Sequence, residues 1–322
     1  MTRPTIVLTD RGWDDAEIER DLCDAAGYDL VDLQEPADAE ALARAVADAD
    51  PVGLLFCWAP VTSGVLAAAP KLRVATRLGV GIDNIDLAEA ARRGLTVTRV
   101  PDYCVEEVSD HVVGLVHAWA RGITTYDRDV RAGRWRPGLL ALRRVRDLTV
   151  GVWGIGAIGS VVATKFVSLG CTVVGHNRSP VTMPDGVESV TADELLARSD
   201  VITLHVPAVP GAAALIGDAE LASMRPGSLL VNTARGALVD IDALVAGLHA
   251  SRPGAAALDV LPHEPEVPTV LRDAMEGPGG VDVIVTPHVA FSSTASVTEL
   301  RVRATEDLLR VLRGEPPLHP VA

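Results

Sequence analysis

A glycine-rich turn between an apolar strand and a helix is the feature that most constrains how this chain can fold. The run LTVGVW leads into GIGAIG at 154–159, and SVVATKFVSLG then has a helical pattern. The first glycine permits the tight turn, the second lets a pyrophosphate approach the backbone, and the third lets helix and strand pack closely. The unpaired amides of the helix N-terminus attract phosphate. We therefore expect a dinucleotide here, with a turn that binds no ligand as the alternative. The expected contacts are Gly154, Gly156, Ala157, Ile158 and Gly159.

Short apolar runs alternate with amphipathic stretches along most of the sequence, a pattern typical of parallel α/β sheets buried under helices on both faces. Residues 105–121 and 295–313 have the pattern of long helices, and the second ends at Gly314. Six runs in the second part of the chain predict one doubly wound nucleotide-binding sheet. The first series of runs is TIVLT, VGLLFCW, LRVATRLG and LTVTRV, and the second is LTVGVWG, CTVVGH, VITLHVP, SLLVNTA, AAALDV and DVIVTPH.

The composition is that of a folded protein with an acidic surface. Of the 322 residues, 48% are hydrophobic and 22% are charged, and the length favours two domains. The net charge of −14 argues against nucleic acid as a partner, because duplex binding needs a basic surface. The four cysteines form no disulfide framework or metal-ligand pair, so we expect no metal site. No apolar stretch has the length of a membrane span or signal peptide, so we expect a cytoplasmic protein without membrane contact.

The second strand of the nucleotide-binding series ends where the ribose of a cofactor is expected. NAD-binding proteins usually place a carboxylate there, about twenty residues beyond the glycines, to bind the ribose 2′-hydroxyl. Here Asn177, Arg178 and Ser179 offer a cation and two neutral hydrogen-bonding groups instead. A guanidinium attracts a 2′-phosphate that a carboxylate would repel. The sequence therefore favours NADP, and NAD, with Arg178 stacked on adenine or facing water, is the alternative.

Six motifs occur in order along nearly the whole chain. They are RLGVGIDNID at 77–86, VPDYCVEEVSDH at 100–111, GVWGIGAIG at 151–159, VNTARGALVD at 231–240, ALDVLPHEP at 257–265 and TPHVAFSS at 286–293. In this order and spacing, they resemble the D-isomer-specific 2-hydroxyacid dehydrogenases, a family that includes phosphoglycerate dehydrogenases, glyoxylate/hydroxypyruvate reductases and the C-terminal-binding-protein corepressors. The resemblance implies an oxidoreductase that moves a hydride between NAD(P)H and a small 2-oxo or D-2-hydroxy acid.

The same resemblance implies that Arg235, Glu264 and His288 are the catalytic residues. His288 would be the general acid/base that donates a proton to the substrate carbonyl oxygen as hydride arrives. Glu264 would hold the imidazole and favour its charged form. Arg235 would bind the substrate carboxylate and polarise the carbonyl. Taken singly, each is equally compatible with an ordinary loop residue, but all three follow predicted strands of one sheet, where open α/β folds bind ligands.

Further contacts to substrate and cofactor are implied by the resemblance. The backbone amides of Val80 and Gly81 would receive the substrate carboxylate, in a loop that glycines keep open, with a plain turn as the alternative. Asp259 would accept a hydrogen bond from the nicotinamide carboxamide, or else be a structural carboxylate at a strand end. The other residues expected to line the cofactor cleft are His205, Val206, Pro207 and Thr233.

The individual substrate is left open by the sequence. Arg77, Cys57 and Trp58 are expected to border the pocket from the first domain, with core or rim positions as the alternative for each. Arg77 would bind a second acidic group of the substrate, and Trp58 would close the pocket around a bulkier substrate side chain. FCWAP and PDYCVEEVSDH resemble the corepressor branch, whereas NRS at the ribose position resembles NADP-using reductases.

The resemblance implies two domains and a dimer. A smaller, flavodoxin-like α/β substrate-binding domain would comprise residues 1–100 and 291–322. A Rossmann domain with a doubly wound parallel sheet, residues 101–290, would be inserted into it. Relatives are usually dimers built through the cofactor domain, so we expect a homodimer. Two other functions remain open: a dinucleotide-sensing protein-binding module of the corepressor type, and a biosynthetic phosphoglycerate dehydrogenase.

Overall fold

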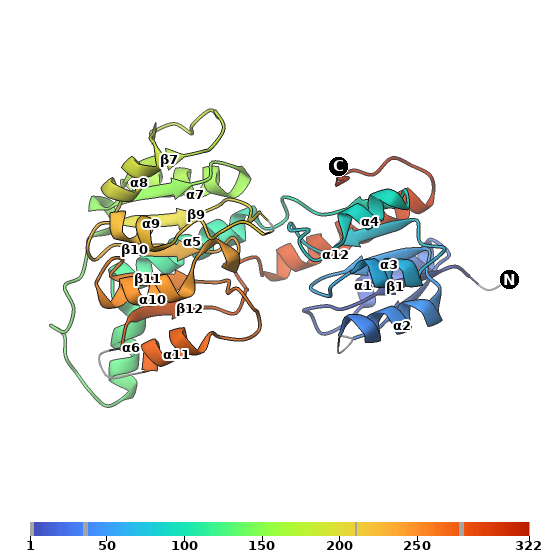
Figure 1. Ribbon diagram of the computed structural model, residues 1–322, viewed down its shortest axis with the longest axis horizontal. Coiled ribbons are helices and arrows are strands. Elements are labelled where there is room, and N and C mark those ends of the chain that lie inside the picture. The colour runs from blue at the N-terminus through green and yellow to red at the C-terminus, as the bar shows by residue number, and fades with distance from the viewer. Residues whose placement is uncertain (1–2, 35–37, 210, 277–279, 322) are drawn as a thin grey trace. The chain divides into compact units, whose positions relative to one another are not determined.

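The computed structural model describes residues 3–34, 38–209, 211–276 and 280–321. The backbone divides into two compact units (Figure 1). Unit 1 comprises Met1–Tyr103 together with Ser293–Ala322, and unit 2 comprises Cys104–Ser292. The chain therefore builds most of unit 1, then all of unit 2, and returns to unit 1 for its last helix.

Unit 1 contains a five-stranded parallel sheet in the order β2-β1-β3-β4-β5. The order changes direction between β1 and β3, which is the switch point of a flavodoxin-like sheet. The sequence analysis did not identify β2, because its DLVD sequence is half polar and lies at the sheet edge without a fully buried side chain. The strands are β1 (Thr5–Leu8), β2 (Asp29–Asp32), β3 (Gly53–Phe56), β4 (Val74–Arg77) and β5 (Thr96–Thr98).

Helices enclose the sheet of unit 1. Leu54 and Phe56 pack into one core with α2, α3 and α4, whereas Gly53, which alternates with them along β3, faces Leu308 of α12. Arg301 of α12 donates to both carboxylate oxygens of the buried Glu19 of α1, at 2.9 and 2.8 Å. These hydrogen bonds join α12, the last helix, to α1, the first. The helices are α1 (Glu17–Ala25), α2 (Ala39–Ala49), α3 (Ser63–Ala68), α4 (Leu87–Arg92) and α12 (Thr294–Leu312).

Unit 2 contains a seven-stranded parallel sheet in the order β12-β11-β10-β9-β6-β7-β8. Its switch point lies between β6 and β9, as in a Rossmann sheet. The expectation of six strands was one too few. Strand β8 has no fully buried residue, so it lacks the apolar run on which that expectation depended. The strands are β6 (Thr149–Trp153), β7 (Thr172–His176), β8 (Val187–Ser189), β9 (Val201–Leu204), β10 (Leu229–Asn232), β11 (Ala255–Leu258) and β12 (Asp282–Val285).

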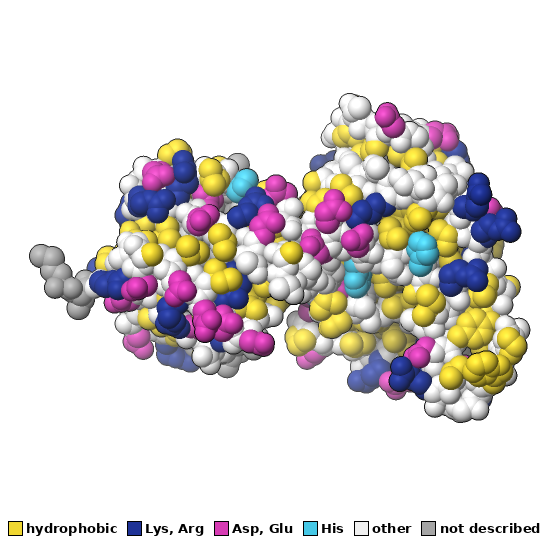
Figure 2. Space-filling model, turned by 180° about the vertical axis from the view of Figure 1, so that it is seen from behind, with side chains coloured by type: hydrophobic (Ala, Val, Ile, Leu, Met, Phe, Trp, Pro, Cys, Tyr) yellow, Lys and Arg dark blue, Asp and Glu magenta, His cyan; other side chains and the backbone are white. Residues whose placement is uncertain are grey.

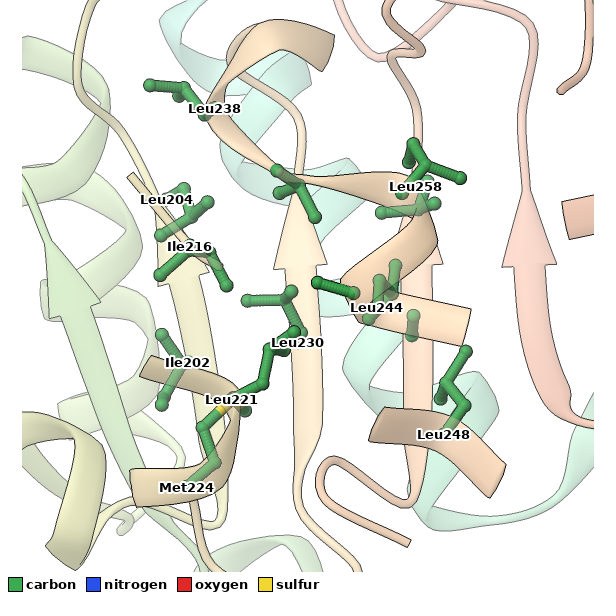
Figure 3. Close-up of a cluster of buried hydrophobic side chains, with 14 of the residues drawn as sticks. Ile202, Leu204, Ile216, Leu221, Met224, Leu230, Leu238, Leu244, Leu248 and Leu258 are labelled. Atoms are coloured by element: carbon green, nitrogen blue, oxygen red, sulfur yellow. The ribbon is translucent and has the colours of Figure 1, made fainter. Parts of the chain in front are cut away.

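Two groups of helices cover this sheet (Figure 1). Helices α5 and α7 pack together over β6, β7 and β10, while α8, α9, α10 and α11 form the second group. The second group encloses a core of aliphatic side chains that includes Ile202, Leu230, Leu244 and Leu258 (Figure 3). The helices are α5 (Val105–Ala120), α6 (Ile123–Arg131), α7 (Ala157–Ser168), α8 (Ala192–Arg198), α9 (Asp218–Ser223), α10 (Ile241–His249) and α11 (Thr269–Glu276), with 3-10 turns η1 (Val145–Asp147) and η2 (Gly236–Leu238).

Candidate active site

The glycine-rich turn of unit 2 joins β6 to α7 as the sequence predicts. Gly154 has a φ of +102°, and a Cβ there would collide with the carbonyl of His205. A Cβ at Gly159 would collide with the carbonyl of Gly154, so α7 packs directly on the turn. Gly156 differs, because nothing lies within 4 Å of a Cβ built on it. The turn is therefore closely packed at its first and third glycines and open at its second, at the N-terminus of α7, which begins with Ala157 and Ile158.

The three polar residues after β7 have different environments. The Asn177 side chain accepts from the amide of Ile155 at 3.1 Å and donates to the carbonyl of Ser179 at 2.9 Å, so it ties the end of β7 to the glycine-rich turn. Arg178 is exposed, and no described residue forms an ion pair or hydrogen bond with its side chain. Of this group, Arg178 is the one with its charge available to a ligand.

Residues after β9 and β10 line the same edge of the sheet. The backbone of His205 and the side chain of Val206 lie against Gly154, and Pro207 follows them on the surface. Burial lowers the pKa of His205 to about 4, so its ring is neutral near pH 7. Thr233 carries a buried hydroxyl oxygen with no hydrogen-bond partner among the described residues. An unpaired buried hydroxyl is unfavourable without a ligand, and the open turn together with this hydroxyl fits a dinucleotide.

Arg235 is positioned by Asn232, a residue that the sequence analysis did not single out. The fully buried Asn232 amide donates to the carbonyl of Arg235 at 2.8 Å and accepts from the amide of Ala234 at 3.0 Å. Gly236 then packs on the backbone of Leu261, where a Cβ would collide. This contact brings the loop after β10 against the loop that carries Glu264.

His288 and Glu264 form a direct pair. The Nδ1 atom of His288 lies 2.6 Å from Oε2 of Glu264, and the amide of Leu261 donates to Oε1 at 2.9 Å. Both side chains are about one-third exposed, 31% for His288 and 34% for Glu264. The carboxylate is thus bonded at both oxygens and still reaches solvent.

The charge of Glu264 is favoured by its neighbours. Partial burial raises the pKa of this carboxyl, but the hydrogen bond and charge of His288, the amide of Leu261 and the charge of Arg235 outweigh it. The pKa of Glu264 is therefore below its ordinary value of 4.5. The structure brings the three predicted catalytic residues together at one edge of one sheet, in a single electrostatic network.

Asp259 is a buried carboxylate, 2% exposed, directly after β11. Its Oδ1 accepts from the Thr286 hydroxyl at 2.6 Å and the Val289 amide at 3.0 Å, and its Oδ2 accepts from the Ala290 amide at 2.9 Å. Because a carboxylate can accept about four hydrogen bonds, one position on Oδ2 is left for a further donor. Asp259 thus has an evident structural role and one unused acceptor position.

In unit 1, a clamp that the sequence analysis missed holds the loop after β3. The buried Asp10 accepts from the amides of Cys57, Trp58 and Ala59, at 2.9, 2.5 and 3.1 Å. From the other side, the Asn84 amide donates to the carbonyls of Cys57 and Ala59, at 3.1 and 3.0 Å. Asp10 lies in the loop after β1 and Asn84 in the loop between β4 and α4, so only the folded sheet brings them to this loop. Trp58, 40% exposed, projects from it over Gly12.

The loop after β4 contains the other predicted substrate residues. No described residue accepts a hydrogen bond from the backbone amide of Val80 or Gly81. Arg77 donates to the carbonyl of Leu78 in its own loop and to Sγ of Cys57 in the loop after β3. The unpaired amides suit an anion, whereas Arg77 is at least partly engaged in holding the loop.

Comparisons with known proteins agree with this geometry. Residues 113–290 match the family model for the D-isomer specific 2-hydroxyacid dehydrogenase NAD binding domain. The chain is 36% identical over 281 residues to the D-3-phosphoglycerate dehydrogenase of Mycobacterium tuberculosis, covering 86% of this chain but 52% of that protein. It therefore spans about half the length of the phosphoglycerate dehydrogenases it matches. It is 33% identical over 296 residues to the glyoxylate reductase of Korarchaeum cryptofilum, covering 90% of this chain and 87% of that one.

Among solved structures, the TT0316 protein of Thermus thermophilus has a TM-score of 0.88 at 31% identity, and the match covers 99% of this chain and 100% of that one. The family match implies a nicotinamide dinucleotide as the cofactor of unit 2. Within the described ranges, no helix is both long and apolar enough to cross a bilayer.

Proposed function

Because the chain belongs to the D-isomer-specific 2-hydroxyacid dehydrogenase family, we propose that it transfers a hydride between a nicotinamide dinucleotide and a small 2-oxo or D-2-hydroxy acid. The pairing of His288 with Glu264, 2.6 Å apart and beside Arg235, is the observation that carries this proposal. When bound, the nicotinamide supplies or accepts the hydride. The residues of the chain supply the proton, the orientation of the substrate and the stabilisation of charge.

His288 is the proton donor in reduction. Its Nδ1 is engaged with Glu264, and no described residue of unit 2 forms a hydrogen bond with Nε2. As the hydride adds to the carbonyl carbon, Nε2–H gives its proton to the carbonyl oxygen, and the 2-oxo acid becomes a 2-hydroxy acid. In oxidation the neutral Nε2 takes the hydroxyl proton back. The Glu264 carboxylate, bonded to Nδ1, fixes the ring so that Nε2 is the atom that exchanges the proton.

Arg235 and the loop after β4 bind the substrate in this proposal. The Arg235 guanidinium is permanently charged and planar, so it suits a carboxylate and polarises the adjacent carbonyl. The unpaired amides of Val80 and Gly81 provide further donors for the carboxylate. Trp58, held by the Asp10 clamp, borders the side chain of the substrate.

Unit 2 binds NADP in preference to NAD in this proposal. The pyrophosphate would lie against Gly154, Gly156 and Gly159 and the first amides of α7. The nicotinamide end would form hydrogen bonds with Thr233 and with the unused acceptor position of Asp259. Support for the 2′-phosphate comes from Arg178, whose exposed side chain pairs with no described residue. The Asn177 side chain accepts from the amide of Ile155 in the turn and donates to the carbonyl of Ser179, so these two residues support the position of Arg178.

The proposal includes a homodimer through unit 2. Helix α6 and the loop after it expose Ile123, Val130 and Trp135 to 56%, 50% and 83%. Figure 2 shows hydrophobic side chains gathered in this area, at the lower right of the view. Contiguous exposed apolar surface of this kind is typical of a protein interface. Sedimentation equilibrium should give a dimer for the wild type and a weaker one for Trp135→Ser, whereas Leu318→Ser, on unit 1, should leave the association unchanged.

A catalytic role is favoured over the binding-module alternative, since the relatives carry the names of dehydrogenases and reductases. We also place the enzyme in the cytoplasm, where its four free cysteines would stay reduced.

Two classes of 2-oxo acid are candidates for the substrate: short acids, such as glyoxylate, and phosphorylated ones. Arg77 is the candidate for binding a second acidic group, and its bond to Leu78 argues for the short acids. Arg99 also reaches this loop, where its guanidinium donates to the carbonyl of Val80 at 3.1 Å.

A spectrophotometric panel of 2-oxo acids with NADPH and NADH tests the proposal. The wild type should reduce at least one acid, His288→Ala should lose turnover while keeping its affinity for the dinucleotide, and His263→Ala, an exposed histidine of the Glu264 loop, should stay active. Failure of the wild type on the whole panel would contradict the proposed reaction.

The cofactor preference has its own test. Arg178→Ala should weaken NADPH binding by about tenfold or more while changing NADH binding little, because a charge-assisted bond is lost only with the phosphate. Arg144→Ala, at an exposed arginine of the loop before β6, should change neither affinity. Equal losses for both dinucleotides in Arg178→Ala would overturn the preference for NADP.

A further inference from the structure

A chain of hydrogen bonds connects helix α5 to the loop that carries His288. The Nε2 atom of His111, on α5, lies 3.1 Å from the hydroxyl oxygen of Thr286. That hydroxyl donates to Oδ1 of Asp259 at 2.6 Å. All members of the chain belong to unit 2. Neither His111 nor Thr286 has a role in the chemistry described above.

The direction of each bond follows from the donors present. A hydroxyl has one hydrogen, and the Thr286 hydroxyl gives it to a carboxylate that can only accept. The hydroxyl oxygen must then be the acceptor toward His111, so His111 carries its hydrogen on Nε2. In this arrangement His111 fixes the rotation of the Thr286 hydroxyl, and the hydroxyl saturates Oδ1 of Asp259.

Asp259 in turn holds the backbone around His288. The amide of His288 donates to the carbonyl of Asp259 at 2.8 Å, and the next two amides, of Val289 and Ala290, donate to its carboxylate. Three successive amides are therefore fixed by one residue. His288 needs this support, because its φ of +54° lies in the left-handed region that a non-glycine residue adopts only when its surroundings impose it.

We propose that His111 and Thr286 are positioning residues for His288: acting through the Asp259 carboxylate, they hold residues 288–290 in the backbone conformation that directs the imidazole to Glu264. The inference rests on the proposed function for the role of His288 in proton transfer. It adds two residues whose side chains form no hydrogen bond with His288 or Glu264; the backbone carbonyl of Thr286 accepts from the His288 amide at 3.0 Å. A displacement of about 1 Å at an acid/base group is enough to lower a rate about a hundredfold.

Matched variants separate the hydrogen bonds from the bulk of the side chains. Thr286→Val has nearly the shape of threonine but no hydroxyl, whereas Thr286→Ser keeps the hydroxyl. His111→Leu removes the donor, whereas His111→Gln retains an N–H near the position of Nε2. For each protein, kcat, the KM of the oxo acid and the Kd of the dinucleotide would be measured, together with hydrogen exchange of the peptide that contains residues 288–290.

Thr286→Val and His111→Leu should lower kcat by about 10- to 100-fold with KM and Kd within about threefold, and should speed exchange of the 288–290 amides about tenfold or more. The Ser and Gln variants should stay near the wild type, and exchange of the strands of unit 2 should be unchanged in all four. Unchanged exchange at 288–290 in Thr286→Val and His111→Leu, or equal losses of kcat in Thr286→Ser and His111→Gln, would overturn the proposal. If the wild type showed no turnover, the proposed function would fall, and the exchange rates alone would decide whether these residues hold the His288 backbone.

Discussion

The Nδ1 atom of His288 lies 2.6 Å from Oε2 of Glu264. Because a carboxylate with a pKa below its ordinary value is charged near pH 7 and can only accept, Nδ1 carries a hydrogen. The other nitrogen, Nε2, is consequently the one that can exchange a proton with a substrate. One contact therefore fixes both the orientation of the ring and the atom that takes part in the reaction.

The glycine-rich turn gives a prediction that separates binding from folding. Gly156→Ala should leave the thermal midpoint nearly unchanged, because there is open space around its Cβ, but should weaken dinucleotide binding about tenfold or more, because that space is where the pyrophosphate would lie. Gly159→Ala should instead destabilise the protein by about 1–3 kcal/mol, because its Cβ would collide with the carbonyl of Gly154. Calorimetry and dinucleotide titration on the two variants check this. Equal stability losses would contradict it.

The Asp10 clamp gives a prediction for unit 1. In Asp10→Asn, the amide nitrogen cannot accept, so at least one of the three amides at residues 57–59 loses its partner. An unsatisfied buried donor costs about 1–3 kcal/mol, so the urea midpoint should fall. The KM of the oxo acid should rise more than kcat falls, because His288 and Glu264 belong to the other unit. The exposed Asp48→Asn is the matched control, and an Asp10→Asn protein that resembled it would show that the clamp is unimportant.

The buried thiols give a prediction for alkaline pH. Burial raises the pKa of Cys57, and that of Cys23, from 9.0 to about 12. The folded chain keeps these protons while the unfolded chain loses them above pH 9, so this part of the stability is complete below pH 9 and is lost between pH 9 and about 12. The loss should be about 1.4 kcal/mol per pH unit for each thiol. Urea unfolding at pH 8 and 10.5 should show a smaller alkaline loss in Cys57→Ala than in the wild type. An identical loss in both proteins would contradict the assignment to Cys57.

Strongly apolar elements could be predicted from the sequence, and short polar ones could not. The helix expected at 105–121 corresponds to α5 at Val105–Ala120, because its apolar period is unbroken. Strands β2 and β8 were missed because edge strands need not bury a full face, so they leave no periodic signal. Their hydrogen bonds to β1 and β7, and not an apolar pattern, make them strands.

The candidate site shows the same limit at the level of side chains. Arg235, Glu264 and His288 could be named because each lies in a recognisable motif, and the structure brings them together. Asp10 and Asn232 could not, because a carboxylate or an amide at or just beyond the end of a strand is indistinguishable in sequence from an ordinary turn residue. The partners of Asp10 lie in a loop that only the folded sheet brings to it, whereas those of Asn232 are two and three residues further along the chain.

A double-mutant cycle on His288 and Glu264 tests the central claim most directly. Steady-state reduction of the preferred oxo acid would be compared for the wild type, His288→Ala, Glu264→Gln and the double variant. If the two side chains act as one acid/base pair, Glu264→Gln should lower kcat/KM about 10- to 100-fold, His288→Ala about a thousandfold, and the double variant no further than His288→Ala alone. Losses that multiply in the double variant would mean that Glu264 does not act through His288.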